Sequence, residues 1–252
     1  MLTSLQYQLL KRMFPVPLET ESKVAPAAVA IDGASKLTLH LGSQLMQQVQ
    51  GKTVMDFGCG EGCEAVALAK AGAKRVIGVD IRPSILEIAR RNAAAAGVQD
   101  ICTFTTSPQA KADVIVSIDA FEHVADPLSI LNAMDEVLSS SGRVVVSFGP
   151  TWYHPLGGHT FSVFPWAHLV FGEDALIRWR SDFKTDGARK FSEVAGGLNQ
   201  MTIRRFEEIV GSSSFEFEHF EAVPIRQFRR FHNRLSREFT TAVIRCSLVK
   251  RG

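Results

Sequence analysis

The stretch VMDFGCGEG, residues 54–62, places a glycine-rich loop directly after a short apolar run. A loop of this kind joins a buried strand to a helix and lets the backbone approach a ligand closely. A dinucleotide fingerprint needs the spacing GxGxxG, and a P-loop needs a following lysine, but neither is present here. The carboxylates of Asp56 and Glu61 would repel a pyrophosphate. The glycines of this loop are instead spaced GxGxG (Gly58, Gly60, Gly62). With its two carboxylates, the loop therefore favours a ligand with positive charge.

Outward from this loop, short apolar runs alternate with segments of helical periodicity. The alternation is typical of βαβ units and predicts a mostly parallel sheet. Strands are expected at 52–57, 75–80, 101–106, 113–119 and 142–148.

The segments between these strands carry the start and stop signals of helices. The first expected helix ends on Gly72, and the second opens with Pro83 and closes on Gly97. A third, 126–142, has Asp126 as its N-cap and a proline in its first turn.

The alternation breaks after Gly149. Residues 150–200 are rich in aromatic residues and too long for an ordinary connection, so they are expected to form a lid for substrate. A helix from 201 and strands at 215–225 and 241–250 then resume the pattern. The predicted organisation is an N-terminal helical cap, a cofactor-binding core, the insertion, and a C-terminal part of the same α/β domain (1–50, 51–149, 150–200, 201–252).

Asp80 ends the second expected strand, 24 residues beyond Asp56. An acidic side chain at this place can accept hydrogen bonds from both hydroxyls of a ribose. A nucleoside with a cationic tail satisfies both this carboxylate and the acidic loop. That description matches S-adenosylmethionine, whose sulfonium and ammonium groups are positive.

DFGCGEG, followed by IGVDI at this spacing and then by VIVSIDAFEHV, closely resembles the class I S-adenosylmethionine-dependent methyltransferases. The resemblance covers residues 36–148 well and 201–250 in outline. It implies an α/β, Rossmann-like, doubly wound sheet of seven strands, mostly parallel, with an antiparallel last strand at 241–250 and a lid inserted after the fifth strand.

The resemblance also implies which residues contact the cofactor. The first loop would hold the methionyl part, Asp80 the ribose and Ile81 one face of the adenine. The family usually has an acidic residue after the third strand to bind the adenine amino group, whereas this chain has TTSPQ, so Thr106 or Ser107 is the expected substitute. The full set implied for the cofactor is Asp56, Phe57, Gly58, Gly60, Gly62, Asp80, Ile81, Thr106, Ser107 and Asp119.

The segment after the fourth expected strand resembles the E-x-x-E-H arrangement of the ubiquinone-biosynthesis O-methyltransferases, with Asp119 in place of the first Glu. There the side chains have been linked to a divalent cation. Asp119, Glu122 and His123 could bind Mg²⁺, or His123 could act as a general base. The expectation is that no metal is held and that the segment caps the next helix and lines the cofactor pocket.

The insertion contributes three further histidines, His154, His159 and His168. Their spacings of five and nine residues do not place three imidazoles on one helical face, which disfavours zinc. His154 or His159 is a candidate proton acceptor. The neighbouring aromatic residues are expected to wall an apolar acceptor pocket, beside the hinge-like backbone of 155–158, or else to form the insertion's own core.

Charge is unevenly distributed, since residues 151–252 hold 15 basic against 11 acidic side chains. Within them, 226–239 has the pattern of a basic amphipathic helix, with one apolar stripe (Phe228, Phe231, Leu235, Phe239). The expectation is a helix docked by this stripe, and the alternative is contact with an anionic membrane.

These features predict methyl transfer from S-adenosylmethionine to a small-molecule acceptor, with an oxygen nucleophile expected. The alternatives are a lipid-like acceptor, a nucleic-acid acceptor, a nicotinamide oxidoreductase and a binding protein without catalysis. A specific nucleic-acid partner is not expected, because DAFE stands where base-amino methyltransferases carry [DN]PP[YFW]. Four cysteines without a CxxC pair, no signal-peptide pattern and no long apolar run favour the cytoplasm.

Overall fold

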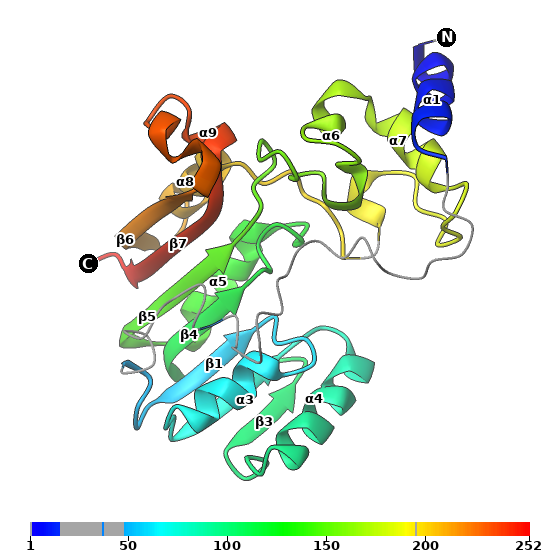
Figure 1. The fold of residues 1–252 in the computed structure, drawn as a ribbon. Helices are drawn as coiled ribbons and strands as arrows, with labels where there is room; N and C mark the ends of the chain where they lie inside the picture. Colours follow the sequence, from blue (N-terminus) through cyan, green and yellow to red (C-terminus); the bar gives the residue numbers. More distant parts are fainter. Residues whose placement is uncertain (1, 16–36, 38–47, 195) are drawn as a thin grey trace.

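The computed structural model describes residues 2–15, 37, 48–194 and 196–252. Within these ranges seven strands form one sheet in the order β3-β2-β1-β4-β5-β7-β6 (Figure 1). The strands from β1 to β5 are parallel, and β7 lies antiparallel between β5 and β6. The predicted sheet with its antiparallel last strand is confirmed. The bounds are β1 Thr53–Phe57, β2 Arg75–Val79, β3 Cys102–Thr105, β4 Ala112–Ile118, β5 Leu138–Phe148, β6 Phe215–Pro224 and β7 Thr241–Lys250.

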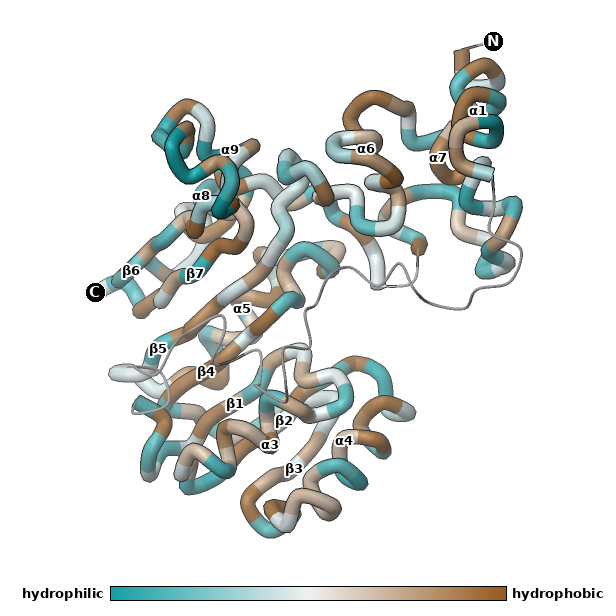
Figure 2. Tube along the Cα trace, in the orientation of Figure 1, coloured by the Kyte–Doolittle hydropathy of each residue, from teal (hydrophilic) through white to brown (hydrophobic). Residues whose placement is uncertain are grey.

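Helices cover both faces of the sheet, and each face has its own apolar core. On one face, α3 (Cys63–Lys70) and α4 (Pro83–Ala95) pack Leu68 and Leu86 against the sheet. On the other, α5 (Pro127–Val137) and α8 (Ile203–Gly211) bury Leu131 and Phe206. The apolar strands between the two layers stand out in Figure 2. This doubly wound arrangement collects the carboxyl ends of the parallel strands at one edge, where ligands bind in such folds.

The predicted N-cap of α5 is confirmed, but the predicted C-terminal end of this helix is wrong. Asp126 caps α5 through a hydrogen bond from the Ser129 N–H at 3.2 Å, as expected. The helix ends at Val137, however, and β5 begins at Leu138, which pairs with Ala112. The three serines at 139–141 compete for backbone hydrogen bonds and do not extend a helix, so they join the strand.

The insertion forms a lobe beside the sheet, with short helices α6 (Ala167–Val170), α7 (Glu173–Arg180), η1 (His159–Phe161) and η2 (Phe191–Glu193). Helix α1 (Leu2–Met13) packs on this lobe, against α7, and not on the sheet (Figure 1). Its buried side chains Tyr7 and Leu10 belong to the lobe's core. Most of the predicted 1–50 cap, namely 16–36 and 38–47, lies outside the described residues.

The predicted amphipathic helix over 226–239 is wrong. The connection from β6 to β7 consists of η3 (Arg226–Phe231), an irregular turn and the short α9 (Arg237–Thr240). Asn233 interrupts the helix, since its side-chain oxygen accepts hydrogen bonds from the N–H groups of Leu235 and Ser236. No helix within the described ranges is long and apolar enough to cross a bilayer.

Candidate active site

The glycine loop leaves the carboxyl end of β1 and leads into α3. Gly58, Gly60 and Gly62 have φ values of +87°, +50° and +79°, a region that favours glycine. A Cβ at Gly62 would lie 2.9 Å from the Cβ of Ala89, so this glycine lets α3 begin against α4. A Cβ at Gly60 would meet no described atom within 4 Å. The loop is thus tightly packed where it enters α3 and open at Gly60.

Asp56, at the end of β1, is a buried acid with an unsatisfied oxygen. Its side chain is 2% exposed, and Oδ2 has no hydrogen-bond partner among the described residues. Burial, reinforced by the nearby Glu64 carboxylate, raises the pKa of Asp56 to about 8. A buried carboxyl with an unsatisfied oxygen is unfavourable in a folded chain and is characteristic of a site that receives a ligand.

Asp80 follows β2 and is already bonded on both oxygens. Oδ2 accepts from the N–H of Gly60 at 3.1 Å, and the Arg82 side chain donates to both oxygens at 2.9 Å. Burial raises the pKa of Asp80, but the hydrogen bonds from Arg82 outweigh it, and the pKa lies below its usual value. Between these two residues, the Ile81 side chain is 86% exposed. An open apolar side chain beside an ionised carboxylate suits the flat base and the diol of a nucleoside.

Arg82 is a site residue that the motifs do not indicate. Because its bond to Asp80 depends on a local turn, only the sequence neighbourhood DIR could have pointed to it. Thr106 and Ser107, beyond β3, are both exposed. The N–H of Ser107 donates to Thr105 Oγ1 at 3.2 Å, which closes a tight turn at this place. Their contact with an adenine stays a prediction.

At the end of β4 the structure brings the insertion against the core. The rings of His123, from the β4 loop, and His159, from η1, lie edge to face with centroids 5.2 Å apart. Asp119 is close enough for its charge to act on His159. Asp119 and His159 both have positive φ, +48° and +52°, although neither is a glycine. Strained backbone of this kind is concentrated at functional sites.

His123 is held in one tautomer by the insertion. Its Nδ1 lies 2.8 Å from the carbonyl oxygen of Gly197, which can only accept a hydrogen bond. Nδ1 therefore carries the hydrogen, and Nε2 of the neutral ring presents a lone pair. Nε2 lies 4.0 Å from Oε1 of Glu122, whose side chain is 4% exposed, whereas the His123 side chain is 32% exposed. The arrangement pairs an accessible nitrogen base with a buried carboxyl group.

Asn199 holds the loop that carries His123, a role that no motif in the chain indicates. Its side-chain NH₂ donates to the carbonyl oxygens of Phe121 and Val124 at 2.6 and 2.7 Å, and its backbone N–H donates to the carbonyl of Glu122 at 3.1 Å. The two carbonyl groups that the Asn199 side chain contacts lie 75–78 residues earlier in the sequence. The end of the insertion thus fixes the loop that carries His123.

The three histidines of the insertion differ in their hydrogen bonding. His168 is 3% exposed and bonded on both nitrogens, to Ser162 and to the Trp152 carbonyl, so its place is structural. His154 accepts the Leu156 N–H on Nδ1 at 2.9 Å, which closes a turn. Nε2 of His159 is buried and has no hydrogen-bond partner among the described residues. Burial, with the neighbouring His123 adding to it, lowers the pKa of His159 to about 4, so the ring is neutral near pH 7.

Asp119, Glu122 and His123 are the candidate metal ligands that follow β4. Among the described residues no group of three or more His, Cys, Asp or Glu has an arrangement that could hold a metal ion. The three side chains therefore do not converge on a common centre in this structure.

Known proteins that resemble this chain point to one family. Residues 48–150 match the family model described as a methyltransferase domain. The chain is 32% identical over 136 residues to the ubiquinone biosynthesis O-methyltransferase of Ruegeria sp. (strain TM1040), over 51% of this chain and 50% of that protein. It is 34% identical over 102 residues to the ribosomal protein L11 methyltransferase of Photobacterium profundum, over 40% of this chain and 35% of that protein.

A solved structure shares the fold. The S-adenosylmethionine-dependent methyltransferase from Mesorhizobium loti has a TM-score of 0.52 and 20% identity, over 82% of this chain and 96% of that one. Residues 48–150 are a methyltransferase domain. The chain spans at most half the length of the two curated relatives, so their activities and acceptors do not transfer with the domain.

The residues of the methyltransferase domain fit its methyl donor. S-adenosylmethionine has a cationic methionyl end and a ribose diol, and the site offers a complement to each. Asp56 has a buried oxygen without a hydrogen-bond partner among the described residues, and Gly60 borders open space. Asp80 lies beside the exposed Ile81, and an arginine that is 59% exposed covers its oxygens. These residues would hold the donor.

Most aromatic residues of the insertion are not a pocket wall. Phe161 and Phe171 are buried within the lobe's own core, together with Trp179 and Phe191. The expectation that they line an acceptor pocket is therefore wrong for these side chains, because the lobe needs them to fold around α1 and α7. Gly157 and Gly158 are likewise buried, and a Cβ on either would come within 2.4 Å of other atoms. They permit close packing and are not a hinge.

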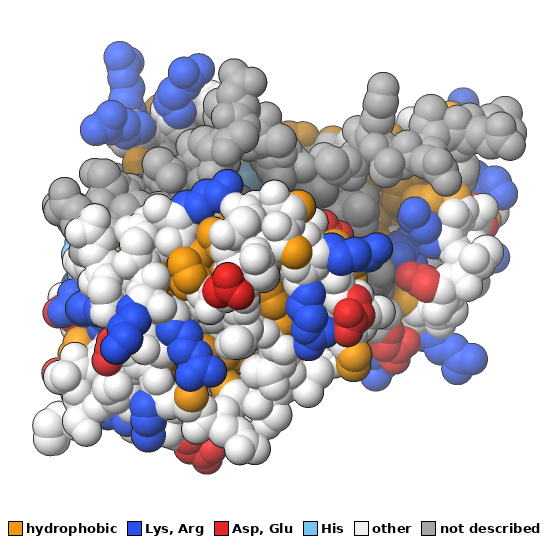
Figure 3. All heavy atoms as spheres, turned by 90° about the horizontal axis from the view of Figure 1, so that it is seen from below, with side chains coloured by type: hydrophobic (Ala, Val, Ile, Leu, Met, Phe, Trp, Pro, Cys, Tyr) orange, Lys and Arg blue, Asp and Glu red, His pale blue; other side chains and the backbone are white. Residues whose placement is uncertain are grey.

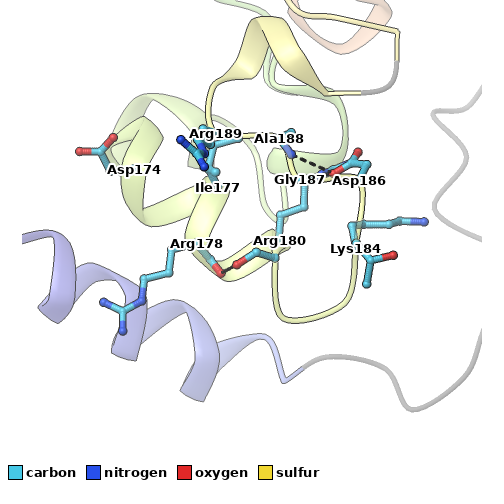
Figure 4. A pocket seen from close by; sticks show the side chains of 11 residues that line it. Asp174, Ile177, Arg178, Arg180, Lys184, Asp186, Gly187, Ala188 and Arg189 are labelled. Atoms are coloured by element: carbon cyan, nitrogen blue, oxygen red, sulfur yellow. Dashed lines mark hydrogen bonds and ion pairs between the residues drawn. The ribbon is translucent and has the colours of Figure 1, made fainter.

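A separate pocket of ≈ 500 Å³ lies in the insertion, between α7 and the loop at 184–189 (Figure 4). Its rim includes Arg180, which forms two hydrogen bonds with Asp186 at 2.7 and 2.6 Å. Arg178 points toward α1, where its guanidinium lies 4.2 Å from the ring centroid of Tyr7. None of the predicted site residues lines this pocket, and its cationic side chains do not converge.

Proposed function

We propose that the chain transfers a methyl group from S-adenosylmethionine to an oxygen nucleophile of a small-molecule acceptor, with His123 as the general base. When bound, S-adenosylmethionine supplies an electrophilic methyl group. The observation that carries the proposal is the hydrogen bond between His123 Nδ1 and the Gly197 carbonyl. It presents the Nε2 lone pair at the carboxyl end of β4, beside the cofactor crevice.

The surroundings of His123 suit proton transfer. A hydroxyl arrives protonated at neutral pH, so its attack on carbon is helped by a base within hydrogen-bond reach. The proton taken by Nε2 creates an imidazolium, which the carboxyl group of Glu122, 4.0 Å away, stabilises when it is ionised. The same division of roles, with a base oriented by one partner and stabilised by another, recurs in nucleophilic catalysis.

His159 and Asp119 position the acceptor. The neutral ring of His159 packs on His123 and closes one side of the base. Asp119 directly follows β4, and its charge acts on the His159 ring. Holding the nucleophile opposite the sulfonium is the larger part of catalysis in an in-line transfer. The similarity to an O-methyltransferase over 136 residues supports oxygen as the accepting atom.

Calorimetry with S-adenosylmethionine, S-adenosylhomocysteine and NAD tests the first step of the proposal. The two sulfur nucleosides should bind, and NAD should not. A panel of phenols, carboxylic acids, amines and thiols, scored by release of S-adenosylhomocysteine, then tests the acceptor. Turnover confined to amines or thiols would overturn oxygen transfer, and absence of binding would overturn the whole proposal.

The His123→Ala variant tests the base. It should lower kcat by roughly 10²- to 10⁴-fold and leave the affinity for S-adenosylmethionine unchanged. His219→Ala is the matched control, because His219 is exposed on β6 and should have no effect on kcat. Equal kcat values for the two variants would show that His123 is not the base.

A further inference from the structure

The connection between β6 and β7, residues 225–240, presents exposed arginines that form no ion pair with an acidic side chain among the described residues. Four exposed arginines lie in its first ten residues, and the first acidic residue of the connection is Glu238 (Arg226, Arg229, Arg230, Arg234). In contrast, the face seen from below in Figure 3 shows basic and acidic side chains interspersed. The arginines therefore give this part of the connection a positive electrostatic potential.

Large apolar side chains project from the same connection. Leu235 is 93% exposed, Phe231 68% and Phe239 45%. A leucine and a phenylalanine this open to water, among arginines, are the composition of a segment that inserts apolar groups below a charged surface.

This tip is held in shape by hydrogen bonds. Ile225 donates its N–H to the Thr240 carbonyl at 2.8 Å, which joins the two ends of the connection. Asn233 Oδ1 accepts the N–H of Leu235 at 2.9 Å and fixes the turn at which that leucine points outward. Arg237 pairs with Glu207 of α8 at 2.6 Å. The exposed side chains are thus presented by a fixed scaffold.

The connection lies at the active-site edge of the sheet. Thr241 begins β7, and Ile244 pairs with Phe148 at the carboxyl end of β5. The connection also contacts the insertion, since the ring of Phe239 lies 5.0 Å from that of Tyr153, and Phe228 stacks on Trp166 at 6.2 Å. Whatever binds the connection is therefore adjacent to the lobe that carries His159.

We propose that the β6–β7 connection docks on an anionic lipid bilayer, with its arginines at the phosphate level and Leu235 and Phe231 in the acyl boundary. A nucleic acid would also attract the arginines, but Leu235 has no π face on which a base could stack. Together with the proposed methyl transfer, on which this step rests, docking indicates an amphiphilic acceptor that is drawn from the bilayer.

Flotation with vesicles tests the proposal on the full chain. Vesicles of phosphatidylcholine with phosphatidylglycerol should bind the protein, those of phosphatidylcholine alone should bind it much more weakly, and added salt should release it. The triple variant R229E/R230E/R234E should lose at least roughly a hundredfold in affinity, since each basic residue near an anionic surface contributes about fivefold. The F231S/L235S variant should also bind the vesicles more weakly, and a change in salt concentration should not restore its binding.

The matched control reverses the same number of charges at the opposite edge of the sheet. K52E/K74E/R75E changes three exposed basic residues at the amino ends of β1 and β2 and should bind vesicles like the parent. Equal loss in both triple variants, or equal binding to neutral vesicles, would overturn docking through this connection. Binding of a single-stranded oligonucleotide in place of vesicles would overturn the choice of partner. Calorimetry with S-adenosylmethionine on the same samples separates failure of docking from failure of the proposed methyl transfer.

Discussion

Three glycine-to-alanine variants separate the packing role of the cofactor loop from its binding role. Gly60, Gly62 and Gly97 all have positive φ, so each alanine variant bears a backbone cost of about 1–2 kcal/mol. Gly97, which follows α4, serves as the reference, because a Cβ there meets no described atom within 4 Å. For a chain of this length, the reference variant should melt roughly 2–8 °C below the parent.

Gly62→Ala should be the least stable of the three. Its Cβ would lie 2.9 Å from Ala89 Cβ and 3.0 Å from the Phe104 ring, both in a tightly packed layer between helix and sheet. Overpacking of this kind adds about 1–3 kcal/mol to the backbone cost. The expected total is about 2–5 kcal/mol, and the melting temperature should fall below that of Gly97→Ala by several degrees.

Gly60→Ala should melt like Gly97→Ala but bind the donor poorly. Its Cβ has room in the free chain, but it would occupy the space into which the donor must fit. A clash of that size costs about 1–3 kcal/mol, which corresponds to roughly a fivefold to hundredfold loss of affinity in calorimetry. Donor affinity equal to that of Gly97→Ala would refute the assignment of this loop to the cofactor. A Gly62→Ala variant as stable as the reference would refute the packing argument.

Two carboxylates give further predictions. Burial raises the pKa of Asp56 from 3.8 to about 8, so the folded chain binds this proton more tightly than the unfolded chain, and stability is lost as pH rises between these values. Asp56→Asn should therefore melt above the parent at pH 8 and close to it at pH 4, while binding S-adenosylmethionine more weakly; a thermal scan without a gain at pH 8 would contradict the burial argument. Asp80→Asn should weaken binding of S-adenosylmethionine and S-adenosylhomocysteine by roughly tenfold to a hundredfold, because hydrogen bonds to a charged group contribute about 1.5–3 kcal/mol. Arg82→Ala, which removes only the side chain that covers Asp80 in the free chain, should change calorimetric affinity far less, and the reverse order would show that the ribose is held elsewhere.

Local signals in the sequence were enough to predict the sheet. Apolar runs, the Asp126 cap and the glycines after β1 and α4 act over a few residues, and the structure confirms each of them. The same approach was wrong for 226–239, where Phe228, Phe231 and Leu235 have helical spacing. There the Asn233 side chain accepts a hydrogen bond from the backbone of the turn, and this bond competes with the backbone hydrogen bonds of a helix. The spacing of the apolar residues carries no information about such a bond.

The cofactor side of the site was easier to predict than the acceptor side. Asp56 lies at the end of β1 and Asp80 directly follows β2, so strand assignment places them at one edge of the sheet. His123 depends instead on Gly197, 74 residues later, and on an insertion whose path no periodic pattern describes. The sequence therefore does not distinguish a pocket wall from a core for the aromatic residues of that insertion, and Phe161 lies in the lobe's own core.

The boundary of the family match explains why relatives leave the acceptor open. The match ends at residue 150, yet the groups that orient and enclose His123, namely the Gly197 carbonyl, the Asn199 amide and the His159 ring, all come from beyond it. The shared domain can therefore be kept while the acceptor changes, because the donor site and the surroundings of His123 are built by different stretches of chain. It follows that acceptor specificity should respond to substitutions within 150–200 that leave donor affinity intact.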